Sequence, residues 1–229
     1  MIPAVVPAFD AERTIGQVVA GIRAAGADPV FVVDDGSRDA TSGIAARAGA
    51  TVLRHAQNRG KGAALWTGFA AALRAGARAV ATLDADGQHD PAELPRLLAA
   101  WHAHAGALVI GARMLAPDRM PGRSRLGNRV STFFLRSFTG QPLSDSQSGF
   151  RIYPAELLRG VTPRARRFDA ETELLLAAVA DGRRVIEVPV QTIYKPGGKT
   201  HFRDVRDTAR IVGVVLRWLY ARRLARSRS

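Results

Sequence analysis

Two aspartates and a glutamine follow a short apolar run in the segment VATLDADGQHDP, residues 80–91. In extended backbone, residues two apart point to the same side, so Asp84 and Asp86 can converge on one point with Gln88 nearby. Carboxylates this close repel each other unless a positive charge lies between them. Their hard oxygen atoms suit Mg²⁺ or Mn²⁺, which also bridge substrate phosphates. A metal site is therefore the preferred interpretation, and a solvated turn in which Asp90 caps a helix is the alternative.

A second pair of carboxylates, Asp34 and Asp35, ends another apolar run in VVDDGSRDAT, residues 32–41. The Asp-Gly sequence favours a tight turn, which would give the pair a purely structural role. Carboxylates at the end of a buried strand can also accept hydrogen bonds from a nucleobase N–H or from ribose hydroxyls. The residues alone do not decide between these two interpretations.

Basic groups accompany the carboxylates. Lys61 lies in the glycine-rich segment NRGKG, residues 58–62, where neither the P-loop spacing nor G-x-G-x-x-G is present. This segment can approach a phosphate or simply begin a helix, and we slightly favour the helix. Four arginines lie in or beside a Pro/Gly-rich loop, where they can bind phosphate or only face solvent: Arg113, Arg119, Arg123 and Arg125. His89 and His201 are candidate metal ligands or bases, although lone histidines in loops usually serve as neither.

Short apolar runs alternate with helical stretches through the first half of the chain, which predicts a mainly parallel sheet covered on both faces. The predicted strands span residues 4–9, 30–33, 51–55, 79–83 and 107–113. Ligands bind at the carboxyl ends of such strands. The candidate groups at these ends are Asp34, Asp35, Asp84, Asp86 and Arg113. In the less regular second half, we expect helices over about 126–138 and 170–182 and a strand over 185–194.

The composition is that of an ordinary folded protein, with 47% hydrophobic and 23% charged residues in a chain of 229. The absence of cysteine excludes disulfides, thiolate zinc sites and cysteine nucleophiles, and it fits a reducing cytosol. No secretory signal is visible, and the apolar stretch 211–220 is about half the length needed to cross a bilayer. The net charge of +13 predicts an anionic partner: nucleic acid, a phosphorylated substrate or an acidic lipid surface.

The C-terminal segment is strongly basic, with eight arginines against two aspartates over residues 203–228. Its apolar residues recur at helical spacing: Ile211, Val212, Val215, Trp218 and Leu219. A basic amphipathic helix with Trp and Tyr suits the surface of an anionic membrane. A helix packed on the core with a solvated basic face fits the pattern equally well.

Taken in order, several segments of the chain resemble glycosyltransferase family 2, and within it the polyprenol-phosphate sugar transferases of the dolichol-phosphate mannose synthase type. They cover nearly all of residues 3–205: VPAFDAERTI, VVDDGSRDAT, NRGKGAAL, TLDADGQHDP, GAR, GNR, DSQSGFRIY, ETELL and VPVQTIYKPGGKTHF. The resemblance implies a GT-A fold, an α/β sandwich with a mixed, mainly parallel sheet covered by helices. Residues 1–204 would then form the catalytic domain, and residues 205–229 the appended basic helix.

The same resemblance implies roles for individual residues. The nucleoside pocket would be lined by Pro7, Phe9, Asp34 and Asp35, and the cation, Mg²⁺ or Mn²⁺, would be held by Asp84, Asp86 and Gln88. The basic groups near the donor diphosphate would be Lys195 and His201, and we count Lys61 and Asp84 among the nucleotide-binding residues as well. Phosphate of the donor or the acceptor would meet Arg113 with Arg123 or Arg125, and the acceptor side would be shaped by Ser148, Gly149 and Arg151. We expect the catalytic set to be Asp84, Asp86, Arg113 and Arg151. The chain departs from the family pattern after Phe9, where Asp10-Ala11-Glu12 replaces the usual Asn-Glu.

The implied activity is inverting transfer of a sugar from a UDP- or GDP-linked donor to a polyprenyl phosphate, at the inner, cytoplasmic face of a membrane. A phosphate acceptor is already largely ionised at neutral pH, whereas a hydroxyl acceptor would need a base such as Asp145, Asp169 or Glu173. One alternative is a family 2 transferase acting on a glycan or lipid hydroxyl. Another is a non-enzymatic basic protein that binds nucleic acid or membrane, although we expect no nucleic-acid partner. Self-association is left open.

Overall fold

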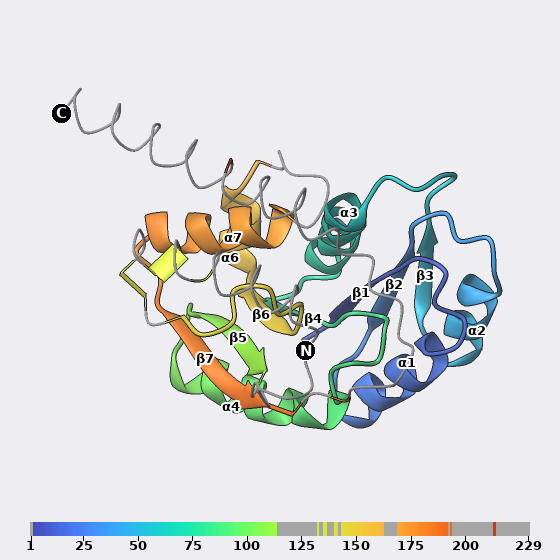
Figure 1. Ribbon diagram of the computed structural model, residues 1–229, viewed down its shortest axis with the longest axis horizontal. Helices are drawn as coiled ribbons and strands as arrows, with labels where there is room; N and C mark the ends of the chain where they lie inside the picture. The colour runs from blue at the N-terminus through green and yellow to red at the C-terminus, as the bar shows by residue number, and fades with distance from the viewer. Residues whose placement is uncertain are drawn as a thin grey trace.

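The computed structural model describes residues 2–113, 132, 135–136, 140–141, 143–162, 169–191, 193 and 213. Within these ranges, seven strands form one sheet in the order β3-β2-β1-β4-β6-β5-β7 (Figure 1). The strands are β1 Ala4–Ala8, β2 Val30–Asp34, β3 Thr51–Arg54, β4 Ala79–Thr82, β5 Leu108–Arg113, β6 Arg151–Pro154 and β7 Val185–Val190. The expectation of a mixed, mainly parallel sheet is confirmed.

The carboxyl ends of six of these strands and the amino end of β6 lie along the same side of the sheet. Only β6 runs antiparallel to its neighbours β4 and β5, while β5 and β7 are parallel to each other. As a result, β5 and β7 point the same way as β1 to β4, and their carboxyl ends meet the amino end of β6. We call this the site edge. The sequence predicted every strand here except β6, where no strand was expected.

Helices cover both faces of the sheet (Figure 1). On one face lie α3 Lys61–Arg74, α6 Ala155–Gly160 and α7 Asp169–Ala180. On the other lie α1 Ile15–Ala24, α2 Thr41–Arg47 and α4 Leu94–Ala103, which follows the short 3₁₀ turn Pro91–Glu93. Each face of the sheet packs against its helices in a separate hydrophobic core. Side chains alternate across a strand, so successive residues such as Val5 and Val6 of β1 lie in different cores. None of the described helices has the length and apolar character needed to cross a bilayer.

Helix α3 packs unusually close to the sheet at Gly68. A Cβ atom added there would lie 2.3 Å from Cγ1 of Val5 in β1, far inside normal contact distance. We therefore expect Gly68→Ala to lower the free energy of unfolding by about 1–3 kcal/mol, despite the better helix propensity of alanine. Urea denaturation measures this change. Gly160→Ala is the control, because an added Cβ meets nothing within 4 Å there, and equal stability of the two variants would contradict the prediction.

Candidate active site

The carboxylate pair reaches the site edge from the end of β4. Asp84 forms an ion pair with Lys61, in which Nζ of Lys61 lies 2.6 Å from Oδ1 of Asp84. A Cβ atom on Gly149 would lie only 2.4 Å from Oδ2 of Asp84, so the absence of a side chain there makes room for the carboxylate. The Thr82 hydroxyl donates to the Gly149 carbonyl at 2.8 Å and fixes this close approach.

Lys61 is both the first residue of α3 and part of the site. Its ammonium also lies 3.2 Å from Glu171 of α7. Burial alone would lower the pKa of Lys61, but the charges of Asp84 and Glu171 outweigh it and raise the pKa above its ordinary value. Burial likewise opposes the charged form of Asp84, yet Lys61 holds the pKa of that carboxyl below its usual range. Sequence reasoning missed Glu171, because its contact with Lys61 joins residues 110 positions apart.

Asp86 differs from Asp84 in its surroundings. Within the described part of the chain it forms no ion pair, and its Oδ1 only accepts the Gln88 N–H at 2.9 Å. Desolvation by neighbouring atoms and the charge of Asp84 raise the pKa of Asp86 to about 6. The Gln88 carbonyl accepts the Ile193 N–H at 2.8 Å, which ties this turn to the segment after β7.

The two carboxylates fit a hard divalent cation. The charge of Asp84 repels that of Asp86, and a cation between the two carboxylates would relieve that repulsion. Among the described residues, no larger cluster of His, Cys, Asp and Glu surrounds the pair. Two carboxylates suit Mg²⁺ or Mn²⁺, since such cations keep several waters and take substrate phosphates as further ligands. His89 is buried against Phe150, and burial lowers its pKa to about 4, so it is neutral.

Arg113 ends β5 at the same edge and is held by a buried acid. Its Nε and Nη2 lie 2.6 and 2.9 Å from the two carboxylate oxygens of Asp145, and its main-chain N–H donates to the same group at 3.2 Å. Burial would raise the pKa of Asp145, but the hydrogen bonds from Arg113 outweigh it and lower the pKa. Asp145 is therefore engaged with Arg113, and this geometry does not favour it as a general base.

Two residues expected on the acceptor side are buried supports. The Arg151 guanidinium, at 0% exposure, donates to the carbonyls of Ser146, Ser148 and Glu171 at 2.7, 2.7 and 2.9 Å. The Ser148 hydroxyl, also fully buried, donates to the Gly111 carbonyl at 2.6 Å. The expectation that these two side chains face the acceptor is therefore wrong. Both are buried and donate to main-chain carbonyls, so they support the 146–149 loop from its buried side.

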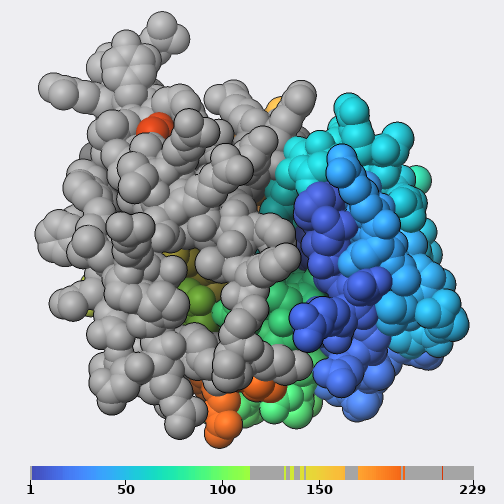
Figure 2. Space-filling view, turned by 45° about the vertical axis from the view of Figure 1, so that its right-hand side comes forward, coloured from blue at the N-terminus to red at the C-terminus, as the bar shows by residue number. Residues whose placement is uncertain are grey.

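A cavity of about 550 Å³ opens at the carboxyl ends of β1, β2 and β3. Its lining residues are Phe9, Asp10, Gly36, Ser37, Arg38, Arg54, Ala56, Gln57 and Asn58. All of them belong to the blue part of the colour range, which forms one continuous surface in Figure 2. Thr14, in the loop after β1, donates to the Ala85 carbonyl at 2.6 Å. The loops that form the cavity therefore adjoin the turn that carries Asp84 and Asp86.

Asp34 and Asp35 do not line the cavity, but their carboxylates hold the loops that surround it. Asp34 accepts hydrogen bonds from the Ser37 N–H and the Ser42 hydroxyl. Asp35 accepts from His55 at 2.6 Å and from the main-chain N–H groups of residues 59 and 60 at 2.9 and 2.7 Å. Both carboxylates are buried, so the structure favours the interpretation in which they order their own loops.

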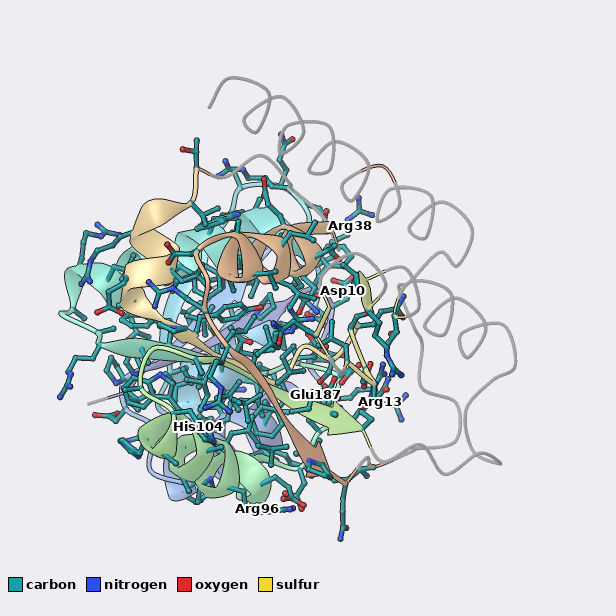
Figure 3. The ribbon with its side chains drawn as sticks, turned by 90° about the vertical axis from the view of Figure 1, so that its left-hand side faces the viewer. Asp10, Arg13, Arg38, Arg96, His104 and Glu187 are labelled. Atoms are coloured by element: carbon teal, nitrogen blue, oxygen red, sulfur yellow. The ribbon has the colours of Figure 1, made fainter. Side chains whose placement is uncertain are left out.

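The residues that depart from the family pattern after Phe9 hold two loops together. Asp10 accepts the Arg38 N–H at 2.9 Å (Figure 3), and Glu12 accepts the Ala40 N–H at 3.1 Å. These acidic side chains therefore join the loop after β1 to the loop after β2. Of the other predicted nucleoside residues, Phe9 lines the cavity and Pro7 is buried within β1.

Several predicted residues lie outside the described ranges: Arg119, Arg123, Arg125, Lys195, His201 and, Gly213 excepted, the tail 205–229. The predicted helix over 126–138 falls largely outside them as well. For the remaining candidate bases, the side chain of Asp169 is not described, and Glu173 is half-buried in α7.

Comparison with known proteins identifies the family. A sequence model of glycosyl transferase family 2 matches residues 4–162. The chain belongs to glycosyltransferase family 2. An uncharacterized protein, MJ1222, of Methanocaldococcus jannaschii is 36% identical over 91% of this chain and 86% of its own. A UDP-N-acetylglucosamine–dolichyl-phosphate N-acetylglucosaminyltransferase of Methanococcus voltae is 29% identical over 91% and 90%.

The solved structures show the fold of this glycosyltransferase. Glucosyl-3-phosphoglycerate synthase from Mycobacterium tuberculosis, in complex with Mn²⁺ and UDP-glucose, superimposes with a TM-score of 0.78 at 24% identity. The match covers 95% of this chain and 78% of that one. The expected GT-A fold is confirmed, and so is membership of the dolichol-phosphate mannose synthase-like group within the family.

Proposed function

We propose that this glycosyltransferase moves a sugar from a nucleotide-linked donor, UDP or GDP, to a polyprenyl phosphate in a reaction that depends on Mg²⁺ or Mn²⁺. The observation that carries the proposal is the carboxylate pair Asp84 and Asp86 at the end of β4, beside Lys61 and the 550 Å³ cavity. The acceptor class follows that of the Methanococcus voltae relative, which transfers to dolichyl phosphate. The net charge of +13 favours anionic ligands on both sides of the reaction.

The donor lies along the site edge in this proposal. Its nucleoside occupies the cavity beside Phe9, and its diphosphate extends toward Asp84 and Asp86, which would hold the cation. A bound divalent cation supplies charge stabilisation to the departing nucleoside diphosphate. Lys61 and Arg113 add fixed positive charge at the same edge, where it acts without the reorganisation that solvent would require.

The acceptor phosphate attacks the sugar from the face opposite the leaving group, which inverts the anomeric centre. A phosphate monoester is mostly dianionic at neutral pH, since its second pKa is about 6, and it needs no base. The pairing of Asp145 with Arg113 supports this assignment, because that carboxylate is already engaged. A hydroxyl acceptor would instead need a base to take its proton.

The test uses matched acceptors. Purified enzyme with Mn²⁺ and sugar-labelled UDP or GDP donors should transfer label to polyprenyl phosphate and not to the corresponding polyprenol, and EDTA should stop the reaction. Transfer only to polyprenol or to glycan hydroxyls would replace this proposal with the hydroxyl-acceptor alternative. No turnover of any donor would count against the proposed activity itself.

We further propose that residues 1–204 form the catalytic domain and that the basic segment 205–229 holds it on an anionic membrane at the inner face. A chain ending at residue 204 should lose most transfer to polyprenyl phosphate embedded in anionic liposomes. It should keep transfer to the same acceptor dispersed in detergent. Unchanged transfer in the liposome assay would place the membrane contact elsewhere in the chain.

A further inference from the structure

We propose that Glu187 of β7 is a positioning residue that fixes the Ser144–Asp145 turn, so that Asp145 holds Arg113 toward the site edge. The proposal rests on the proposed function in one respect, the assignment of Arg113 to the donor diphosphate. Glu187 lies outside the strand ends from which the site was predicted. It would act on the ligand only through two other residues.

Glu187 faces the turn from the middle of an edge strand. It pairs with Ile110 of β5, three residues before Arg113. Glu187 is labelled in Figure 3. Both of its carboxylate oxygens lie 2.8 Å from the Ser144 main-chain nitrogen, and one lies 2.6 Å from the Ser144 hydroxyl. The other accepts the Asp145 N–H at 3.1 Å. The Glu187 carboxylate thus accepts hydrogen bonds from the main-chain N–H groups of two successive residues, Ser144 and Asp145.

Fixing this main chain also fixes the Asp145 carboxylate. Asp145 is fully buried and is held further by the Gln147 N–H, which donates to its Oδ1 at 3.2 Å. Its two oxygens take the Arg113 guanidinium in a forked contact, which defines both the position and the plane of that group. A small rotation of the turn would therefore swing the guanidinium.

Arg113 is close enough to the carboxylate pair for its position to matter. Ile110 pairs with Arg151 of β6, and Arg151 pairs with Thr82 of β4, so Arg113 and Asp84 leave the sheet at the same edge, two strands apart. A phosphate that bridges this interval depends on where the guanidinium lies, because forked donors bind phosphate only in a narrow geometry.

The nearest competing explanation is that Glu187 only stabilises the turn. Glu187→Gln distinguishes the positioning role from the purely structural one. It keeps the shape of the side chain but places an amide NH₂ against the N–H groups of Ser144 and Asp145. If Glu187 positions Arg113, the variant should bind UDP or GDP with Mn²⁺ at least about tenfold more weakly by calorimetry. Ser144→Ala should lose less than about threefold, since the main-chain contacts remain. Glu156→Gln, exposed on α6, should bind as the parent does.

A double-mutant cycle tests whether Glu187 acts through Arg113. The double variant Arg113→Met/Glu187→Gln should bind nucleotide no more weakly than Arg113→Met alone. Without the Arg113 guanidinium, the Glu187 substitution has no phosphate-binding group to displace. Additive losses, or parent-like affinity of Glu187→Gln, would overturn the inference.

The same cycle measured by urea denaturation without nucleotide keeps the inference testable in any case. The effects of the two substitutions on the free energy of unfolding should be non-additive, and additivity would also overturn the inference. Failure of the parent enzyme to bind either nucleotide would instead count against the proposed function.

Discussion

Replacing Asp86 by asparagine should strongly slow sugar transfer while leaving the unliganded enzyme as stable as the parent or slightly more stable. The substitution keeps the shape of the side chain and removes the charge that the proposed cation requires. Loss of one such electrostatic contact in an active site costs about 10²–10³-fold in rate. Initial rates with labelled donor and polyprenyl phosphate measure this effect.

The stability half of this prediction follows from the raised pKa of Asp86, about 6. An acid whose pKa is raised by folding stabilises the fold while protonated, so the parent should lose stability as the pH rises from about 4 to about 6. Asp86→Asn has no such loss. The Asp86 side chain is exposed, so solvent screening limits the effect to no more than about 1 kcal/mol.

The control for this experiment is Asp90→Asn. Asp90 caps the turn before α4 by accepting the Ala92 N–H at 2.9 Å, and asparagine caps equally well. Mn²⁺ with UDP or GDP should raise the melting temperature of the parent and of Asp90→Asn, and not that of Asp86→Asn. Parent-like turnover of Asp86→Asn would remove the carboxylate pair from the mechanism.

Replacing Arg151 by methionine should have the largest effect on stability. Three buried carbonyls lose their donor, and Glu171 loses a nearby positive charge, so we expect a loss of about 3–5 kcal/mol in the free energy of unfolding. For a chain of this size, that corresponds to a fall in melting temperature of roughly ten degrees. Arg151→Lys should recover only part of the loss, because an ammonium cannot reproduce the planar fork.

Chemical denaturation of Arg151→Met and Arg159→Met measures this difference. Arg159 is exposed in the last turn of α6, and its replacement should change stability by less than about 0.5 kcal/mol. Equal stabilities of the two methionine variants would show that the Arg151 contacts contribute little to the fold.

The sequence was sufficient to place the carboxylates and Arg113 at one edge of the sheet. Each follows an apolar run, and alternation with helices makes the strands parallel, so their ends must coincide. It was not sufficient for β6, because a four-residue strand carries little pattern and its place between β4 and β5 is decided by pairing.

The same limit explains the two side chains expected on the acceptor side. Arg151 and Ser148 match a family motif, but whether a side chain faces the ligand or the core depends on its register within the sheet for Arg151 and on tertiary contacts of the preceding loop for Ser148. The contacts between Lys61 and Glu171 and between Arg113 and Asp145 join segments far apart in sequence. Neither spacing nor periodicity reports such a contact.

The antiparallel strand β6 has a consequence for how this scaffold can diversify. Because β5 ends and β6 begins at the same edge, the chain between Arg113 and Arg151 departs from the site and returns to it. Its length can change during evolution without moving any strand, since a longer connection costs little in closure entropy. We therefore expect insertions between these two strands to alter the site edge and to leave the strand order unchanged.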